Sequence, residues 1–214
     1  DFVKSREYCR KGIEMLKKED SNNYSNAFFY HIIGQLDIKD KNFDKSFLNF
    51  DKSNYFIEKE EVKSLSMQHL NIDTKQRLAE SCIGLNQLNQ AKSLLDEVVF
   101  LQVDLKYREY RTFEVKSKYY SKLNDSKLTL LNINESIKSA TQKTLRASEY
   151  SVIPRMYYNL ADYHKRGNEV SDGLEAIQRG LSYFSDALVL DVNYNPPIID
   201  IQDTEIALKL MILK

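Results

Sequence analysis

Apolar residues recur along most of this chain every three or four positions, the spacing of one face of an amphipathic helix. Short polar clusters interrupt the pattern. The alternation of apolar and polar residues that is typical of strands is missing from the sequence, and so are regularly spaced turn clusters. Pro154 is expected to open its helix, because a proline in the first turn removes no helical hydrogen bond. The pattern predicts helices over residues 2–18, 24–38, 43–57, 73–85, 87–105, 107–122, 126–146, 154–167, 171–188 and 204–213.

Composition agrees with this all-α prediction. The 214 residues include only 6 glycines and 3 prolines, so few positions break a helix. Apolar residues make up 42% and charged residues 29% of the chain, as in ordinary globular proteins. A chain of 25.1 kDa is long enough to bury a sizeable core.

Small residues recur at matching places in successive helix pairs. Gly34 is followed twelve positions later by Ser46, and a large apolar residue, Phe50, comes four positions after that. The same spacing occurs in the second and fourth pairs, at Ala79, Ala91 and Leu95 and at Ala161, Gly173 and Ile177. The third pair fits less well and is aligned on Glu114, Ser126 and Leu130, after an aromatic at Tyr110 that corresponds to Tyr30 and Tyr157. Small residues at such positions let two helices approach closely.

This pattern resembles the tetratricopeptide repeat. The resemblance implies a right-handed superhelical solenoid of antiparallel helix pairs over residues 1–190, with a partial repeat at 1–20. Full repeats start near residues 27, 72, 107 and 154, and residues 191–214 form a linker and a capping or truncated helix. The spacings of 45, 35 and 47 between these starts exceed the family period of about 34 residues. The proline that usually follows the second helix is absent.

Residues 191–214 also resemble the exit from the repeat region of bacterial CHAT proteins. Their Asn-Pro linker at Asn195 and Pro196 precedes an Asp-containing, Leu-rich helix. In those proteins a tetratricopeptide array precedes a caspase-like protease domain, so the resemblance implies a Cys-His protease beyond Lys214. Because the chain opens at Asp1 inside a predicted helix, we expect it to be a piece of a longer protein.

The sequence offers no candidate for catalysis, metal binding or a cofactor. His31, His69 and His164 are far apart and match no metal-ligand spacing, and no glycine-rich phosphate loop occurs. Cys9 and Cys82 lie in helical context, so we expect two reduced, buried thiols. The interpretation is a protein that is not an enzyme.

Charge is balanced overall but polarised along the chain. Lys plus Arg and Asp plus Glu both total 31, which argues against a dedicated nucleic-acid binder. Residues 104–166 hold 13 basic and 7 acidic residues, net +6, whereas residues 1–103 are net −1 and residues 167–214 net −5. No apolar run approaches the roughly 18 residues of a membrane span. We expect no membrane contact and a cytoplasmic, bacterial protein.

The first helix of each pair would line the concave face of such a solenoid, where ligands usually lie. The predicted partner-binding residues on this face are Phe28, His31, Gln35, Arg108, Arg111, Lys118, Arg155, Tyr158 and Lys165. The second half of the face is basic, which favours an acidic segment or a terminal carboxylate as partner. The predicted function is a non-catalytic protein- or peptide-binding scaffold. The alternative is the sensor or regulatory arm of a larger bacterial protein, either a CHAT protease or a peptide-responsive transcription regulator.

Overall fold

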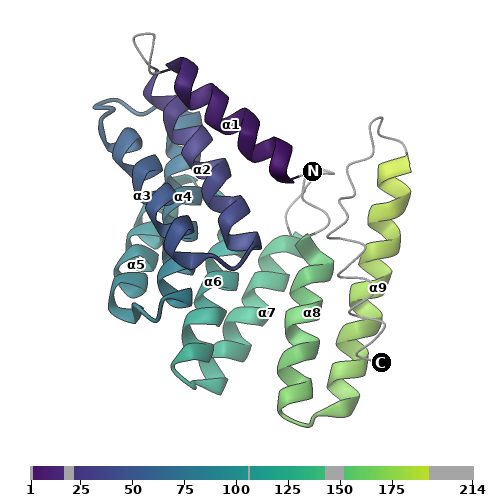
Figure 1. Ribbon diagram of the computed structural model, residues 1–214. Coiled ribbons are helices and arrows are strands. Elements are labelled where there is room, and N and C mark those ends of the chain that lie inside the picture. The colour runs from purple at the N-terminus through teal and green to yellow at the C-terminus, as the bar shows by residue number, and fades with distance from the viewer. Residues whose placement is uncertain (1, 17–21, 106, 143–151, 193–214) are drawn as a thin grey trace. The chain divides into compact units, whose positions relative to one another are not determined.

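All regular structure in the described part of the chain is helical, as the sequence predicts. The computed structural model describes residues 2–16, 22–105, 107–142 and 152–192, and it has no strand within them. Its helices are α1 (Phe2–Leu16), α2 (Asn23–Lys39), α3 (Phe43–Glu58), α4 (Leu65–Gly84), α5 (Leu88–Leu105), α6 (Glu109–Lys122), α7 (Ser126–Gln142), α8 (Val152–Arg166) and α9 (Val170–Val192) (Figure 1).

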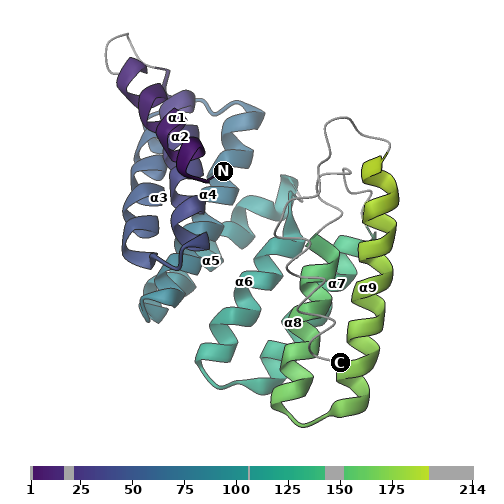
Figure 2. The same cartoon turned by 45° about the vertical axis from the view of Figure 1, so that its right-hand side comes forward.

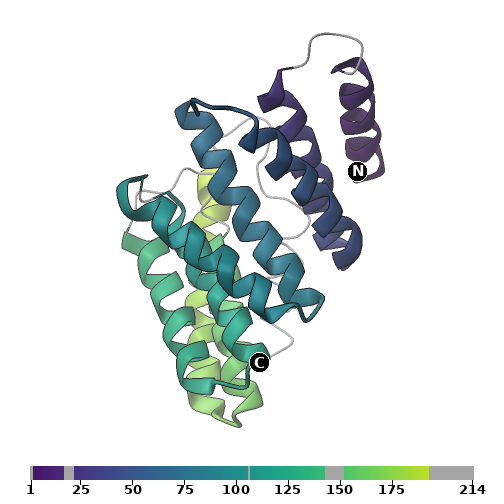
Figure 3. The same ribbon diagram turned by 90° about the vertical axis from the view of Figure 1, so that its left-hand side faces the viewer.

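The chain divides into two compact units, Asp1–Arg108 and Glu109–Lys214. In the first unit each helix from α1 to α5 packs on the next, and α2 also contacts α4 (Figure 3). In the second unit α6 to α9 pack in the same consecutive way (Figure 2). Each unit is therefore built from neighbouring helices that lie close together in the sequence.

The starts of α4 and α8 differ from the sequence prediction. Helix α4 begins at Leu65 rather than at residue 73, because the Ser64 side chain accepts a hydrogen bond from the Met67 N–H at 3.3 Å and caps the helix. Helix α8 begins at Val152, so Pro154 is its third residue rather than its first, still within the turn where its missing N–H costs nothing. The helix predicted over 204–213 lies outside the described residues.

Four helix pairs are joined by the same tight turn. Each turn has one residue with positive φ, and these residues are Lys41, Asn86, Asn124 and Asn168, with φ between 56° and 61°. The N–H of the following residue donates to the carbonyl five residues earlier, over 2.8 to 3.0 Å. This is the bond of a Schellman motif, in which a left-handed residue ends one helix. Three of the four positive-φ positions are Asn, which tolerates that conformation better than most residues.

Counting from the positive-φ residue gives one register for all four pairs. Small side chains lie seven residues before it and small or Thr side chains five residues after it, and a large apolar residue lies nine after it. These positions hold Gly34, Ala79, Ser117 and Ala161; Ser46, Ala91, Thr129 and Gly173; and Phe50, Leu95, Ile133 and Ile177, all of them buried. The repeat is thus a packing pattern as well as a sequence pattern.

This register corrects the sequence alignment of the third pair by three residues. The small position is Ser117 rather than Glu114, and Thr129 and Ile133 take the places assigned to Ser126 and Leu130. Ser126 is exposed, whereas Thr129 and Ile133 are 4% and 5% exposed. The aromatic residue four positions before Ser117 is then Phe113 instead of Tyr110.

Gly34 shows why the small positions are small. A Cβ added there would lie 2.9 Å from the ring of Phe50, which is fully buried on the second helix of the pair. The two helices can approach this closely only without a side chain at residue 34. The second unit has its own core, formed by Tyr110, Ile133, Ile137, Ala140, Ile153, Met156, Tyr157, Ala161, Ala176 and Ile177.

Gly34→Ala is expected to lower the free energy of unfolding by about 1–3 kcal/mol, because the added methyl must displace the Phe50 ring. Gly173→Ala is the matched control: its Cβ would have no neighbour nearer than 3.7 Å. That substitution should raise stability by about 0.5–1 kcal/mol, the usual gain on replacing a helical glycine. Urea unfolding followed by circular dichroism measures both. Equal effects of the two substitutions would contradict the close approach at Gly34.

Candidate partner-binding surface on α6 and α8

A buried carboxylate gathers three of the predicted basic residues in the second unit. The Glu114 side chain is 3% exposed, and its Oε2 lies 3.2 Å from Arg111 Nη1 and 3.0 Å from Arg155 Nη2. The Lys118 Nζ lies 3.9 Å from the other oxygen, Oε1. We call Arg111, Glu114, Lys118 and Arg155 the Glu114 cluster.

Helix geometry explains how this cluster forms. Arg111 and Lys118 lie three residues before and four residues after Glu114 on α6, the spacings that place side chains on one helix face. Arg155 comes from the first turn of α8 and reaches the same carboxylate from a different helix. The ion pair therefore joins the first helices of two successive pairs.

The basic side chains of the cluster differ in their exposure. Three cations surround the Glu114 carboxylate. The Arg111 side chain is 7% exposed, whereas Lys118 and Arg155 are 40% and 34% exposed. Glu114 thus holds Arg111 inside while Lys118 and Arg155 present positive charge to solvent.

The remaining predicted residues of the second unit have separate environments. Tyr158 is partly buried and packs against the core of that unit. Lys165 is exposed in the last turn of α8. Neither side chain belongs to the Glu114 cluster.

Arg108, another basic residue predicted for the binding face, belongs to the first unit. Its Nη1 lies 2.7 Å from Oδ2 of Asp73, and its side chain is 33% exposed. The guanidinium lies 5.2 Å from the ring centre of Tyr107, which stacks on His69. Arg108 is therefore anchored by Asp73 rather than by Glu114.

His31 and Gln35 lie in a polar network beneath the surface of the first unit. His31 is 3% exposed, its Nε2 accepts from the Gln35 side-chain amide at 2.7 Å, and its Nδ1 lies 3.0 Å from Thr74 Oγ1. The edge of its ring packs against Phe50 at 5.3 Å between ring centres. Both ring nitrogens are engaged, so this histidine has a packing role. Phe28, at 41% exposure, is the more accessible of the predicted residues on α2.

Glu114 was not among the site residues predicted from the sequence. It was aligned with the small packing position, which belongs to Ser117 three residues later. The position of Glu114 in the repeat can be found by counting from Asn124, the left-handed residue in the turn after α6. Counted from there, Glu114 matches His31, Gln76 and Tyr158 in the other pairs.

The two cysteines are buried thiols, as expected. Cys9 is 8% exposed and Cys82 is fully buried. Burial raises the pKa of Cys9 above its usual value and raises the pKa of Cys82 to about 11. At neutral pH both are protonated and poorly nucleophilic.

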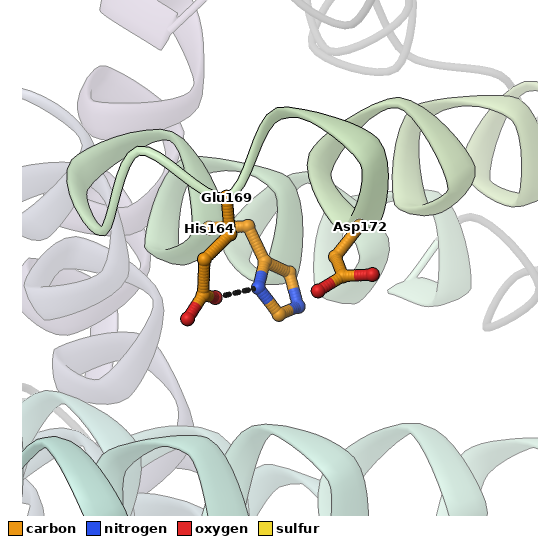
Figure 4. Close-up of side chains that lie close together, drawn as sticks. All are labelled: His164, Glu169 and Asp172. Carbon is orange, nitrogen blue, oxygen red and sulfur yellow. Dashed lines mark hydrogen bonds and ion pairs between the residues drawn. The ribbon is translucent and has the colours of Figure 1, made fainter.

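A different group of side chains has the chemistry of a metal site. Within the described residues, His164, Glu169 and Asp172 bring one ligand atom each to within 4.8 Å of one another (Figure 4). These residues were not predicted from the sequence, because only the turn at Asn168 brings His164 close to Glu169 and Asp172.

Comparisons with known proteins bear on the fold. No family model and no curated protein matches the chain. Among solved structures it is similar to BtubC (BKLC) from P. vanneervenii, with 10% sequence identity and a TM-score of 0.63 over 99% of this chain and 81% of that one. This likeness supports the all-α fold. None of the described helices combines the length and the apolar character needed to cross a membrane.

Glu114→Gln is expected to destabilise the protein by about 3 kcal/mol, because it removes the buried carboxylate that pairs with the buried Arg111 and with Arg155. The control is Glu135→Gln on α7, whose carboxylate is 39% exposed and pairs with the exposed Lys138. That change should cost less than about 1 kcal/mol. Chemical unfolding of both variants measures the difference. A Glu114→Gln variant as stable as the Glu135→Gln variant would contradict an anchoring role for Glu114.

Proposed function

We propose that this chain is a non-catalytic scaffold that binds an acidic peptide or protein segment at the Glu114 cluster. The observation that carries the proposal is the meeting of Arg111, Lys118 and Arg155 at one buried carboxylate. Two of these cations, Lys118 and Arg155, are also partly exposed and can be reached by a partner.

The geometry of the cluster suits a carboxylate-bearing partner. Glu114 restrains the guanidinium of Arg155 on one edge, and a restrained guanidinium loses less side-chain entropy when it binds a second carboxylate. Lys118 adds a mobile positive charge four residues along the same face of α6. The excess of basic residues over 104–166, 13 against 7, would also attract an acidic chain at long range.

The helix pairs are proposed to form a tetratricopeptide-like, right-handed solenoid. The support is the common turn, whose positive-φ residues are spaced by 45, 38 and 44 positions, and the buried register counted from it. In such arrays the first helices of successive pairs line the binding face. The contact of α2 with α4 and the ion pair between α6 and α8 fit that arrangement.

Cys82 and His31, two side chains of kinds that often act in catalysis, have packing roles. The thiol of Cys82 is fully buried, with a pKa raised to about 11, which disfavours a nucleophilic thiolate. His31 is buried with both ring nitrogens hydrogen-bonded. These environments favour binding over chemistry as the role of the protein.

The proposal predicts that the chain binds a fluorescein-labelled oligoglutamate peptide more tightly than its oligoglutamine counterpart. Lys118→Glu and Arg155→Gln should each weaken oligoglutamate binding about tenfold, the equivalent of about 1.4 kcal/mol. Fluorescence anisotropy measures the affinities, and raising the salt concentration should weaken the wild type because exposed charges are screened. An amidated peptide separates recognition of side-chain carboxylates from recognition of a terminal carboxylate.

Lys138→Glu on α7 is the matched control, because it reverses an exposed charge outside the Glu114 cluster. It should change the affinity no more than about twofold through long-range charge alone. Circular dichroism establishes that each variant is folded. Equal losses for Lys138→Glu and Lys118→Glu, or equal binding of the glutamate and glutamine peptides, would refute the proposal.

A further inference from the structure

We propose that His164, Glu169 and Asp172 form a binding site for one divalent transition-metal ion of the Zn²⁺ class. The site lies at the turn between α8 and α9, and it is separate from the Glu114 cluster in both its residues and its chemistry. His164 is in the last turn of α8, Glu169 precedes α9, and Asp172 is in the first turn of α9. The proposal concerns this hairpin alone and does not depend on the proposed function.

The three side chains already face one another. Glu169 Oε2 accepts a hydrogen bond from His164 Nδ1 at 2.6 Å. Figure 4 shows the imidazole between the two carboxylates, with its other nitrogen on the side of Asp172. One ligand atom from each residue lies within 4.8 Å of those from the other two. Two ligands of one Zn²⁺ lie about 2.0–2.2 Å from the ion, so small side-chain rotations would close the site.

This arrangement has the chemistry of a metal-binding histidine. A carboxylate that accepts from Nδ1–H fixes the ring and the tautomer, and it leaves the lone pair of Nε2 directed outward. Nε2 and the Asp172 carboxylate would then bind the ion directly, with water completing the coordination, while Glu169 orients the ring. The mixed nitrogen and oxygen donors favour Zn²⁺ or a similar transition metal over Mg²⁺ and Ca²⁺, which prefer oxygen alone.

The backbone holds the donors in place. The Glu169 N–H donates to the His164 carbonyl at 2.9 Å, and the Gly173 N–H donates to the Glu169 carbonyl at 3.0 Å. The left-handed conformation of Asn168, with φ of 60°, sets the direction of the turn. The His164 side chain is 12% exposed and Glu169 is 52% exposed, so the ring is supported by packing while the site stays open to ions from solvent.

The other three turns show that the fold does not require these residues. The positions equivalent to His164, Glu169 and Asp172 are occupied by Asp37, Asn42 and Lys45; by Cys82, Gln87 and Gln90; and by Tyr120, Asp125 and Leu128. None of these sets offers a histidine and two carboxylates.

The residue equivalent to Glu169 also behaves differently in two of those turns. Asn42 and Asp125 cap the following helix by accepting from the N–H of Lys45 at 3.3 Å and of Leu128 at 2.9 Å. Glu169 accepts from His164 instead. Its carboxylate therefore orients the histidine rather than capping the helix.

Isothermal titration of the metal-free full chain with ZnCl₂ tests the proposal. We expect one Zn²⁺ per chain, with an affinity well above that for MgCl₂ or CaCl₂. His164→Ala should abolish the binding, and Glu169→Gln should weaken it about 10- to 100-fold, the usual effect of removing the partner of a metal-bound histidine. Zn²⁺ should also raise the melting temperature of the wild type but not of His164→Ala, because a ligand of the folded state stabilises it.

His69→Ala and Glu175→Gln are the matched controls. His69 stacks on Tyr107 in the first unit, and Glu175 is an exposed residue on α9 that pairs with Arg179. Both variants should bind Zn²⁺ as the wild type does, and circular dichroism establishes that all variants are folded. The proposal is overturned if the wild type binds no Zn²⁺, if His164→Ala binds it as tightly, or if Ca²⁺ binds as well as Zn²⁺.

Discussion

A tight turn ends the first helix of each pair and sets how the two helices of the pair lie. A residue in the left-handed conformation reverses the chain, and the backbone N–H of the next residue donates a hydrogen bond to the carbonyl five residues before it. This fixes how the second helix lies against the first. Small residues then lie seven before and five after the turn residue, and at Gly34 the Phe50 ring packs against the space that a side chain would fill. Local backbone geometry and helix packing therefore support each other.

The same constraint places the polar groups of both candidate sites. Glu114 lies ten residues before Asn124, on a face of α6 that Arg155 of α8 can reach. His164 and Glu169 lie four residues before and one residue after Asn168, which brings a helix C-terminus and a helix N-terminus together. Side chains with binding chemistry thus occupy positions that the turn makes close.

The sequence predicted the helices well because their apolar spacing is a local property. The spacing of small and large residues also identified the packing positions in three pairs, because Gly34, Ala79 and Ala161 are clearly smaller than their neighbours. It failed in the third pair because Ser117 is a less conspicuous small residue, and the nearby Phe113–Glu114 was taken in its place. It could not assign Glu114 a role, since burial of a charge depends on partners from another helix. It could not pair His164 with Glu169 and Asp172 without the turn.

The position ten residues before the turn residue carries a polar side chain in the first three pairs, and within each unit that side chain bonds to a residue later in the chain. It holds His31, Gln76 and Glu114 in the first three pairs, all buried although polar. A buried polar group needs a partner, and each finds one later in the chain: Thr74 for His31, the Arg108 carbonyl for Gln76 and Arg155 for Glu114. A neutral side chain at this position needs only a neutral hydrogen-bond partner, whereas the buried charge of Glu114 requires cations. The basic surface on α6 and α8 is therefore a consequence of which polar residue occupies a position that serves packing in the other pairs.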